Sequence, residues 1–222
     1  MDDSRFRHDG ATRYPEYDVL SKRGGPSWNE QTRRVITRRL SIDTQPHFFN
    51  VAEFESVSAI AARIVPQLAL RPPIPVAALV DHKLHNGISD GYRVAGMPRE
   101  REAWRQGLKA LDAEATAAYG KRFADLAEGL QDHLLACMQR GDLNNPEWGS
   151  MHPQDFFTKR MARDIVLAYY AHPTAWSEIG WGGPASPRGY VRLDFDERDP
   201  WEAAEANEND VSRVRRTNRN VS

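Results

Sequence analysis

Residues 50–66 read NVAEFESVSAIAARIVP and predict a helix with both of its ends marked. Asn50 followed three residues later by Glu53 is the pattern of a capping box, in which each side chain bonds the backbone N–H of the other residue. Apolar residues then recur every three or four positions, which is the spacing of one helix face. Pro66 has no N–H to continue the helix, so we expect it to end there.

Four more segments downstream repeat this helical period. They are expected at about 77–86, 98–119, 125–140 and 153–171. A glycine follows each of the first three, as is common just past a helix end, and the last stops where His172 precedes Pro173. No comparable run alternates strictly between apolar and polar residues, which would indicate a strand. The sequence therefore predicts an all-α fold, a small bundle of about five helices.

The two ends of the chain differ from this helical body, expected at residues 48–172. Residues 1–47 show no sustained period, and residues 171–190 alone hold three prolines and four glycines. Disordered segments are poor in tryptophan, yet four of the six tryptophans lie in these ends. We therefore expect an extended N-terminal arm (1–47) and a C-terminal arm (173–210) that are ordered against a surface belonging mostly to another chain. The basic tail, 211–222, is expected to be disordered.

Composition excludes several classes of function. Cys137 is the only cysteine among the 222 residues, so no intrachain disulfide and no multi-cysteine metal or iron–sulfur site can form. The formal net charge of −1 provides no general field that attracts nucleic acid or an anionic membrane. No window approaches the roughly 18 apolar residues of a membrane span, and the charged start of the chain is unlike a signal peptide.

The residue patterns assign no catalytic, cofactor-binding or metal-binding residue to this chain. Nucleotide-binding, phosphate-binding, nucleophile-elbow and zinc-protease motifs are all missing. Asp81, His82 and His85 are close enough on one helix to suggest metal ligands, but they lie opposite the apolar face, on the side that a helix normally turns to water. A stand-alone metal-dependent enzyme that uses His82 and His85 stays as one alternative.

Five blocks of sequence together resemble one family. They are FFNVAEFESVSAIAARIVPQ (48–67), PVAALVDHKLHNGISDGYR (75–93), MPREREAWRQGLKALDAEA (97–115), FFTKRMARDIVLAYY (156–170) and AHPTAWSEIGWGGPASPRGYVRLDFDERDPWEA (171–203). The chain resembles the gluconate 2-dehydrogenase subunit 3 family over roughly residues 28 to 206. The resemblance implies a helical, cofactor-free small (gamma) subunit that binds a large catalytic subunit of the glucose-methanol-choline oxidoreductase class.

In that family the large subunit holds FAD and oxidises a sugar, and a cytochrome often accepts the electrons. We therefore expect a non-catalytic subunit that stabilises the FAD-containing partner of a sugar or glycoside dehydrogenase, in a heterodimer or larger hetero-oligomer. A chaperone that meets its partner only during maturation is the second alternative. The residues expected to bind the partner are Trp28, Tyr170, His172, Trp176, Ile179, Trp181, Pro184, Pro187, Arg188, Tyr190 and Trp201.

The resemblance also raises the question of export. Small subunits of this family commonly carry a twin-arginine signal, which needs an apolar stretch just after the arginine pair. Here Arg33 and Arg34 are followed by VITRRLSIDTQ, which contains two more arginines. We therefore expect a cytoplasmic protein, with a periplasmic location through a signal on the partner as the alternative.

Overall fold

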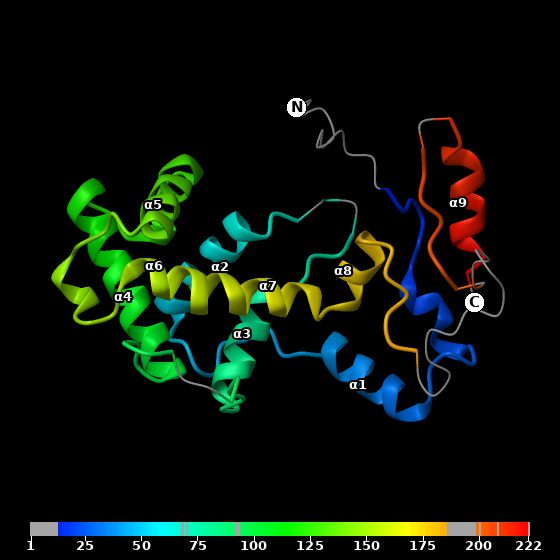
Figure 1. The fold of residues 1–222 in the computed structure, drawn as a ribbon, viewed down its shortest axis with the longest axis horizontal. Coiled ribbons are helices and arrows are strands. Elements are labelled where there is room, and N and C mark those ends of the chain that lie inside the picture. The colour runs from blue at the N-terminus through cyan, green and yellow to red at the C-terminus, as the bar shows by residue number, and fades with distance from the viewer. Residues whose placement is uncertain are drawn as a thin grey trace. The chain divides into compact units, whose positions relative to one another are not determined.

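The computed structural model describes residues 13–67, 69, 71–91, 94–185, 199, 201–207 and 209–221. Within these residues every regular element is a helix, which confirms the predicted all-α class (Figure 1). The chain divides into two compact units. We call residues 42–67 and 75–169 the body unit, and residues 1–41, 68–74 and 170–222 the arm unit. Both arms therefore belong to one unit, together with a short segment that the sequence places in the body.

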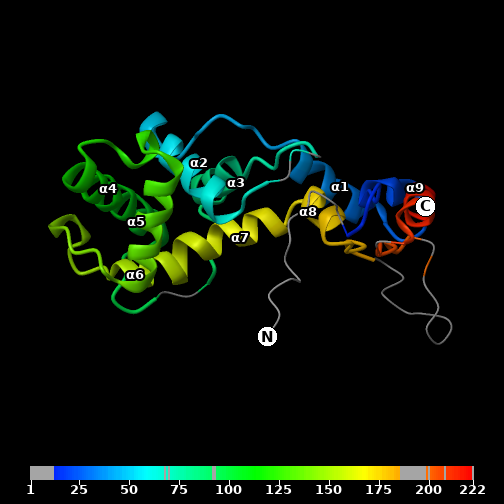
Figure 2. The same cartoon turned by 90° about the horizontal axis from the view of Figure 1, so that it is seen from above.

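The body unit contains all five helices that the sequence predicts. They are α2 (Val51–Ile64), α3 (Val76–His85), α4 (Glu100–Tyr119), α5 (Glu128–Arg140) and a continuous run made of α6 (Pro153–Phe156), the π-helical η5 (Phe157–Met161) and α7 (Ala162–Tyr170). Two short 3-10 turns, η3 (Phe123–Asp125) and η4 (Pro146–Trp148), join them. In both views α4, α5 and α6 lie side by side (Figures 1 and 2).

The predicted capping box at the start of α2 is present. Asn50 and Glu53 exchange hydrogen bonds of 2.9 Å between side chain and backbone. Asp125 and Glu128, before α5, have the spacing of a second capping box, but they do not form one. Asp125 lies in η3, where its carboxylate accepts from Arg122 Nε at 3.0 Å, and α5 begins without a side-chain cap. The Arg122 guanidinium therefore binds the Asp125 carboxylate, which the spacing predicts as a helix cap.

Trp104 of α4 lies at the centre of the body unit. It is fully buried, and its ring makes edge contacts with the rings of Phe49 and Phe156, each at a centroid distance of 5.8 Å. Phe156 in turn packs on Gly107, where an added Cβ would lie 2.3 Å from ring atoms. The close approach of α6 to α4 thus depends on a residue without a side chain.

Replacement of Gly107 by alanine should destabilise the body unit by about 1–3 kcal/mol, the usual cost of overpacking a core. The measurement is urea unfolding followed by circular dichroism. Gly129→Ala is the matched control, because nothing lies within 4 Å of its added Cβ and alanine is the better helix former. Equal stability of the two variants would contradict the packing described.

In the described part of the arm unit there are four helical elements: η2 (Val19–Gly24), α1 (Glu30–Leu40), α8 (Pro173–Glu178) and α9 (Val211–Arg219). Three of them correct the sequence-based expectation. Helix α1 lies inside the arm that was expected to be extended, α8 begins at Pro173 in the other arm, and α9 occupies the tail that was expected to be disordered.

The physical reasons for these corrections are local. Helix α1 buries only Ile36, so its sequence carries almost no apolar period, although Asn29 caps it by accepting from Thr32 N–H at 2.9 Å. Proline is favoured in the first turn of a helix, which permits α8. Helix α9 is held by Val214 and Asn218, both buried, among residues that are otherwise charged or polar.

Candidate partner interface

The two arms bury their aromatic residues against each other. Tyr17, Trp28, Trp176 and Trp201 belong to one hydrophobic cluster, in which each is less than 10% exposed. Tyr17 Oη donates to the backbone oxygen of Trp201 at 3.0 Å. Val19 N–H donates to Ser177 Oγ at 3.1 Å. These bonds join residues more than 150 positions apart, so the arms form a folded unit from their own side chains.

Asn218 of α9 adds a second connection between the ends of the chain. Its side-chain oxygen accepts from Ala204 N–H at 2.7 Å, and its side-chain nitrogen donates to the backbone oxygens of Pro15 and Ala204 at 2.9 and 3.0 Å. A buried amide with three partners satisfies its polar groups and fixes the geometry around it. The tail is therefore an ordered part of the arm unit.

This packing changes the role of several residues expected to bind a partner. Trp28, Trp176 and Trp201 are only 1%, 2% and 6% exposed, so their rings contact this chain and offer no surface to another. His172 is also buried; it caps α8 by accepting from Thr174 N–H at 3.3 Å. Burial, with a smaller contribution from Arg39, lowers the pKa of His172, which favours the neutral ring that a cap requires.

Three other expected residues do remain at the surface, and we call them the exposed apolar patch. Tyr170, Ile179 and Trp181 are 46%, 47% and 43% exposed and flank the buried Trp176. The Trp181 ring meets the Trp176 ring edge-on at 4.9 Å between centroids. Trp176 Nε1 donates to the backbone oxygen of Tyr170 at 2.6 Å, and Ile179 ends α8.

Two glycines set the turn that carries this patch. Gly180 and Gly183 have φ of 70° and 66°, a conformation that other residues adopt only with strain. A Cβ on Gly180 would lie 2.4 Å from the Tyr14 ring, and one on Gly183 would lie 3.0 Å from the Trp176 ring. Pro184 is half-buried beside them, whereas the expected contacts Pro187, Arg188 and Tyr190 lie outside the described residues.

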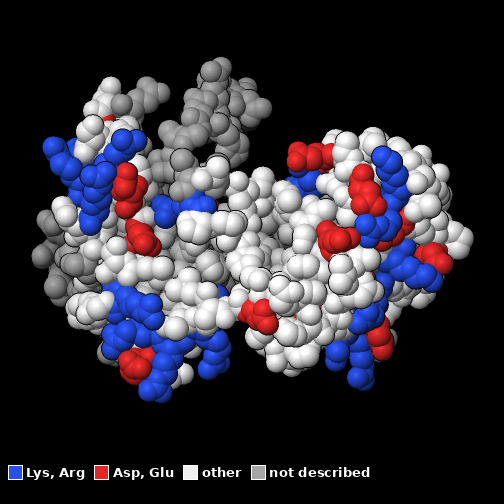
Figure 3. Space-filling view, turned by 180° about the vertical axis from the view of Figure 1, so that it is seen from behind, with Lys and Arg blue, Asp and Glu red and all other residues white. Residues whose placement is uncertain are grey.

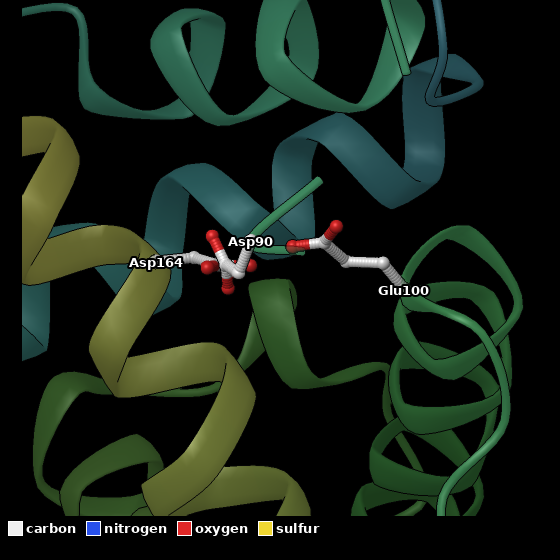
Figure 4. Close-up of side chains that lie close together, drawn as sticks. All are labelled: Asp90, Glu100 and Asp164. Atoms are coloured by element: carbon white, nitrogen blue, oxygen red, sulfur yellow. The ribbon is translucent and has the colours of Figure 1, made fainter. Parts of the chain in front are cut away.

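The body unit holds a separate cluster of six charged side chains, which we call the ion cluster. It comprises Lys83, Asp90, Glu100, Arg160, Arg163 and Asp164. Figure 4 shows its three carboxylates converging from α4, α7 and the loop between α3 and α4. Lys83 Nζ lies 3.0, 2.7 and 2.8 Å from oxygens of Asp90, Glu100 and Asp164. Arg160 pairs with the same three acids, and Arg163 with Asp90.

The electrostatics of the ion cluster favour the charged forms of Lys83 and Asp90. Burial lowers the pKa of Lys83, but hydrogen bonds to Asp164 and Glu100 outweigh it and the net pKa is raised. Burial raises the pKa of Asp90, but Lys83 and Arg163 outweigh it and the net pKa is lowered. Asp164, whose side chain is fully buried, also accepts from Trp104 Nε1 at 2.9 Å. The cluster thus ties α3, the following loop, α4 and α7 together.

Sequence reasoning missed the ion cluster, although one signal pointed to it. Arg160 and Asp164 lie four residues apart on the same helix face as the apolar positions Met161 and Ile165, which predicts a charge pair on the buried face of the helix. The π-helical η5, which contains Arg160, is a kind of insertion often found at functional sites. The carboxylates of Asp90, Glu100 and Asp164 could form a metal-binding group, but here they face three cationic side chains.

The expected alternative site at Asp81, His82 and His85 does not come together. Asp81 is buried, and its carboxylate accepts from the N–H groups of His47, Phe48 and Phe49 at 2.8 to 3.0 Å. His82 and His85 are exposed on α3. Because Asp81 is fully engaged in holding the 47–49 segment, these three residues provide no converging set of ligands.

On the face drawn in Figure 3, lysine and arginine side chains stand in several groups, with fewer acidic side chains among and beside them. None of the described helices is both long enough and apolar enough to cross a membrane.

Comparison with known proteins places the chain in a family. The family described as gluconate 2-dehydrogenase subunit 3 matches residues 51–183, which is more than half of the chain, and the chain belongs to this family. The match includes the whole exposed apolar patch and the ion cluster. No curated protein and no solved structure matched the chain.

Removal of one charged side chain from the ion cluster should lower the stability of the folded chain. We expect Asp164→Asn to destabilise the chain by about 3–5 kcal/mol, because Lys83 and Arg160 lose the carboxylate that compensates their burial. Chemical denaturation measures this change. Asp142→Asn, which removes an exposed carboxylate paired with Arg140 at 2.7 Å, is the control and should shift stability by less than about 0.5 kcal/mol. If Asp164→Asn changed the stability as little as the control does, the cluster would not hold these helices together.

Lys22 of η2 gives the arm unit a pH dependence. Its side chain is buried, its Nζ has no hydrogen-bond partner among the described residues, and the Trp28 ring centroid lies 5.4 Å away. Burial lowers the pKa of Lys22 to about 8. The charged amine therefore opposes folding fully below about pH 8, and this penalty disappears as pH rises toward the ordinary lysine pKa of about 10.4.

Lys22→Met should therefore be more stable than the wild type at pH 7, with a difference on the order of 3 kcal/mol that shrinks by pH 10. Urea unfolding followed by tryptophan fluorescence at pH 7, 8, 9 and 10 measures the difference. A difference that stays constant over this range would show that the Lys22 amine does not titrate as described.

Proposed function

We propose that this chain is a non-catalytic small subunit that binds and stabilises an FAD-containing catalytic subunit of the glucose-methanol-choline oxidoreductase class, within a sugar dehydrogenase complex. Membership of the gluconate 2-dehydrogenase subunit 3 family supports this, because the family is named for one subunit of a dehydrogenase. In this proposal the chain carries no cofactor, and electrons leave the partner's FAD for a separate acceptor such as a cytochrome.

The observation that carries the proposal is the exposed apolar patch. Tyr170, Ile179 and Trp181 are large apolar side chains that stay about half exposed on a unit in which Tyr17, Trp28, Trp176 and Trp201 are buried. All three lie inside the residues that match the family. Tryptophan and tyrosine are the residues that most often dominate interface energies, because they bury a large rigid area at low entropic cost.

The patch is also well ordered for docking. Trp181 is fixed by its N–H bond of 2.9 Å to the backbone oxygen of Trp176 and by the edge contact between the two rings. Gly180, between the two tryptophans, and Gly183, two residues after Trp181, have the positive φ that shapes this turn. A preformed surface binds with less loss of conformational freedom than a flexible arm. In this proposal the partner meets a rigid patch on a folded unit, in place of the extended arms, ordered mostly against another chain, that the sequence suggested.

The first test is co-purification of the tagged chain expressed together with its native neighbours. We expect a larger, yellow, FAD-containing chain to co-elute in a stable ratio. A partner that binds only during expression and leaves on purification would favour the maturation chaperone. A colourless lone chain with its own oxidoreductase activity would overturn the proposal. Fractionation of the native cells would show whether the complex lies in the cytoplasm or in the periplasm.

A paired variant tests the patch itself. Trp181→Ala and Ile179→Ser together should weaken binding of the catalytic subunit at least about 30-fold, since an interface anchor contributes about 2 kcal/mol or more. Surface plasmon resonance with the purified partner measures the affinity.

The matched control is Leu130→Ala, which removes a side chain of similar exposure (38%) from α5. Circular dichroism of the lone variants verifies that each is folded. Unchanged affinity in the folded double variant would show that the partner docks elsewhere, even if co-purification succeeds.

A further inference from the structure

Helix α1 of the arm unit is strongly basic. Its 11 residues include four arginines and a single acid, Glu30, and Arg23 of η2 joins them, because its guanidinium donates to Thr37 Oγ1. The whole chain has 30 basic and 31 acidic residues, so this excess of positive charge is a local feature. Figure 3 shows a group of lysine and arginine side chains over α1, at the lower left of that view.

The arginines of α1 have few acidic partners in the described part of the chain. Glu30 is shared, since it accepts from Arg34 Nε at 3.0 Å and from Arg33 Nε at 3.5 Å. Neither Arg38 nor Arg39 pairs with any carboxylate that the structure describes. Arg34 and Arg38 are both exposed and four residues apart, the spacing at which like charges destabilise a helix. Negative charge from another molecule removes this repulsion.

Arg39 connects this basic helix to the exposed apolar patch. Its Nη1 donates to the backbone oxygen of Ala171 at 3.1 Å, and its guanidinium lies 5.7 Å from the centroid of the Trp176 ring. Ala171 follows Tyr170 in the chain, and the Trp176 ring contacts the Trp181 ring. The basic helix and the patch are therefore neighbours on one folded unit.

Exposed apolar side chains also occur on α1 itself. Val35 is 37% exposed and lies one helical turn before Arg39, so the two side chains share one side of the helix. The helix buries only Ile36, which leaves most of its surface accessible. An apolar centre bordered by polar side chains, with arginine enriched, is the usual composition of a protein interface.

We propose that α1 and the exposed apolar patch form one continuous interface, and that the surface of the catalytic subunit which meets α1 is acidic. This inference rests on the proposed function, because it takes the catalytic subunit as the partner. Carboxylates of that subunit pair with Arg34 and Arg38 at the border of the contact, since a guanidinium binds a carboxylate through two parallel hydrogen bonds. The family match begins at residue 51, so α1 lies outside it and family membership does not cover this contact.

An acidic protein surface fits α1 better than an anionic membrane does. A helix that lies in a membrane surface buries a broad apolar side among the lipids. The large apolar side chains that α1 exposes are Val35 and Leu40, and they lie on different sides of the helix. The arginines thus surround no broad apolar face that could enter a bilayer.

The salt dependence of association tests the inference. Surface plasmon resonance with the purified catalytic subunit gives the association rate at about 0.01, 0.1 and 1 M sodium chloride, where the screening length falls from about 30 to 10 to 3 Å. We expect the rate to fall about tenfold or more over this range. A partner that binds at a rate independent of salt would overturn the inference and leave the proposed function standing. If no catalytic subunit binds at all, both fail together.

A charge-reversal variant locates the attraction on α1. Arg34→Glu with Arg38→Glu should slow association about tenfold or more at about 0.01 M salt. The matched control is Arg215→Glu with Arg216→Glu, which makes the same change in net charge at exposed positions of α9 and should leave the rate nearly unchanged. Circular dichroism verifies that each variant is folded. Equal slowing by both pairs would mean that net charge alone attracts the partner, and it would overturn the assignment to α1.

Cosedimentation with vesicles of phosphatidylcholine and phosphatidylglycerol tests the other source of negative charge. We expect no binding of the lone chain at about 0.1 M salt, where a surface charge is screened within about 10 Å. Vesicle binding that disappears in the Arg34→Glu, Arg38→Glu variant would assign α1 to a membrane surface and would overturn its assignment to the catalytic subunit.

Discussion

The burial of Trp176 between the two ends of the chain is the contact on which the candidate interface depends. Its ring is 2% exposed, its Nε1 donates to Tyr170, and the Arg39 guanidinium lies 5.7 Å from the ring centroid. A ring of this size buries 150–250 Å² of surface, so removal of its surroundings would expose a large apolar area. Because the Trp176 ring is buried and contacts both residues, Tyr170 and Trp181 hold fixed positions while their side chains stay exposed. The arm unit is thus a folded platform, and in our proposal its surface binds the partner.

The body unit is held by a different kind of contact. Its apolar core around Trp104 is continuous with the ion cluster through the bond from Trp104 to Asp164. A buried network of this type fixes one arrangement of the helices because any other would leave a charge without a partner.

The sequence predicts the body helices well and the arms poorly, for a physical reason. The α2 capping box, the apolar stripes and the closing glycines Gly120 and Gly141 are local signals, and the structure confirms the helices they mark. Helices α1 and α9 bury one or two residues each, so no period reveals them. Of the candidate contacts, Tyr170, Ile179 and Trp181 are exposed. Trp28, in contrast, lies in one hydrophobic cluster with Trp176 and Trp201, which follow it by 148 and 173 residues, and no local pattern shows this.

Hydrogen exchange of the lone chain tests the central claim, that the arms fold on each other without a partner. The amides of Val19, bonded to Ser177, and of Ala206, bonded to the backbone oxygen of Arg13, connect segments far apart in the sequence. We expect both to be strongly protected, as the amides inside α4 are. Exchange of these two amides at unfolded-chain rates, with α4 still protected, would contradict the account and would mean that the arms take their structure only from another chain.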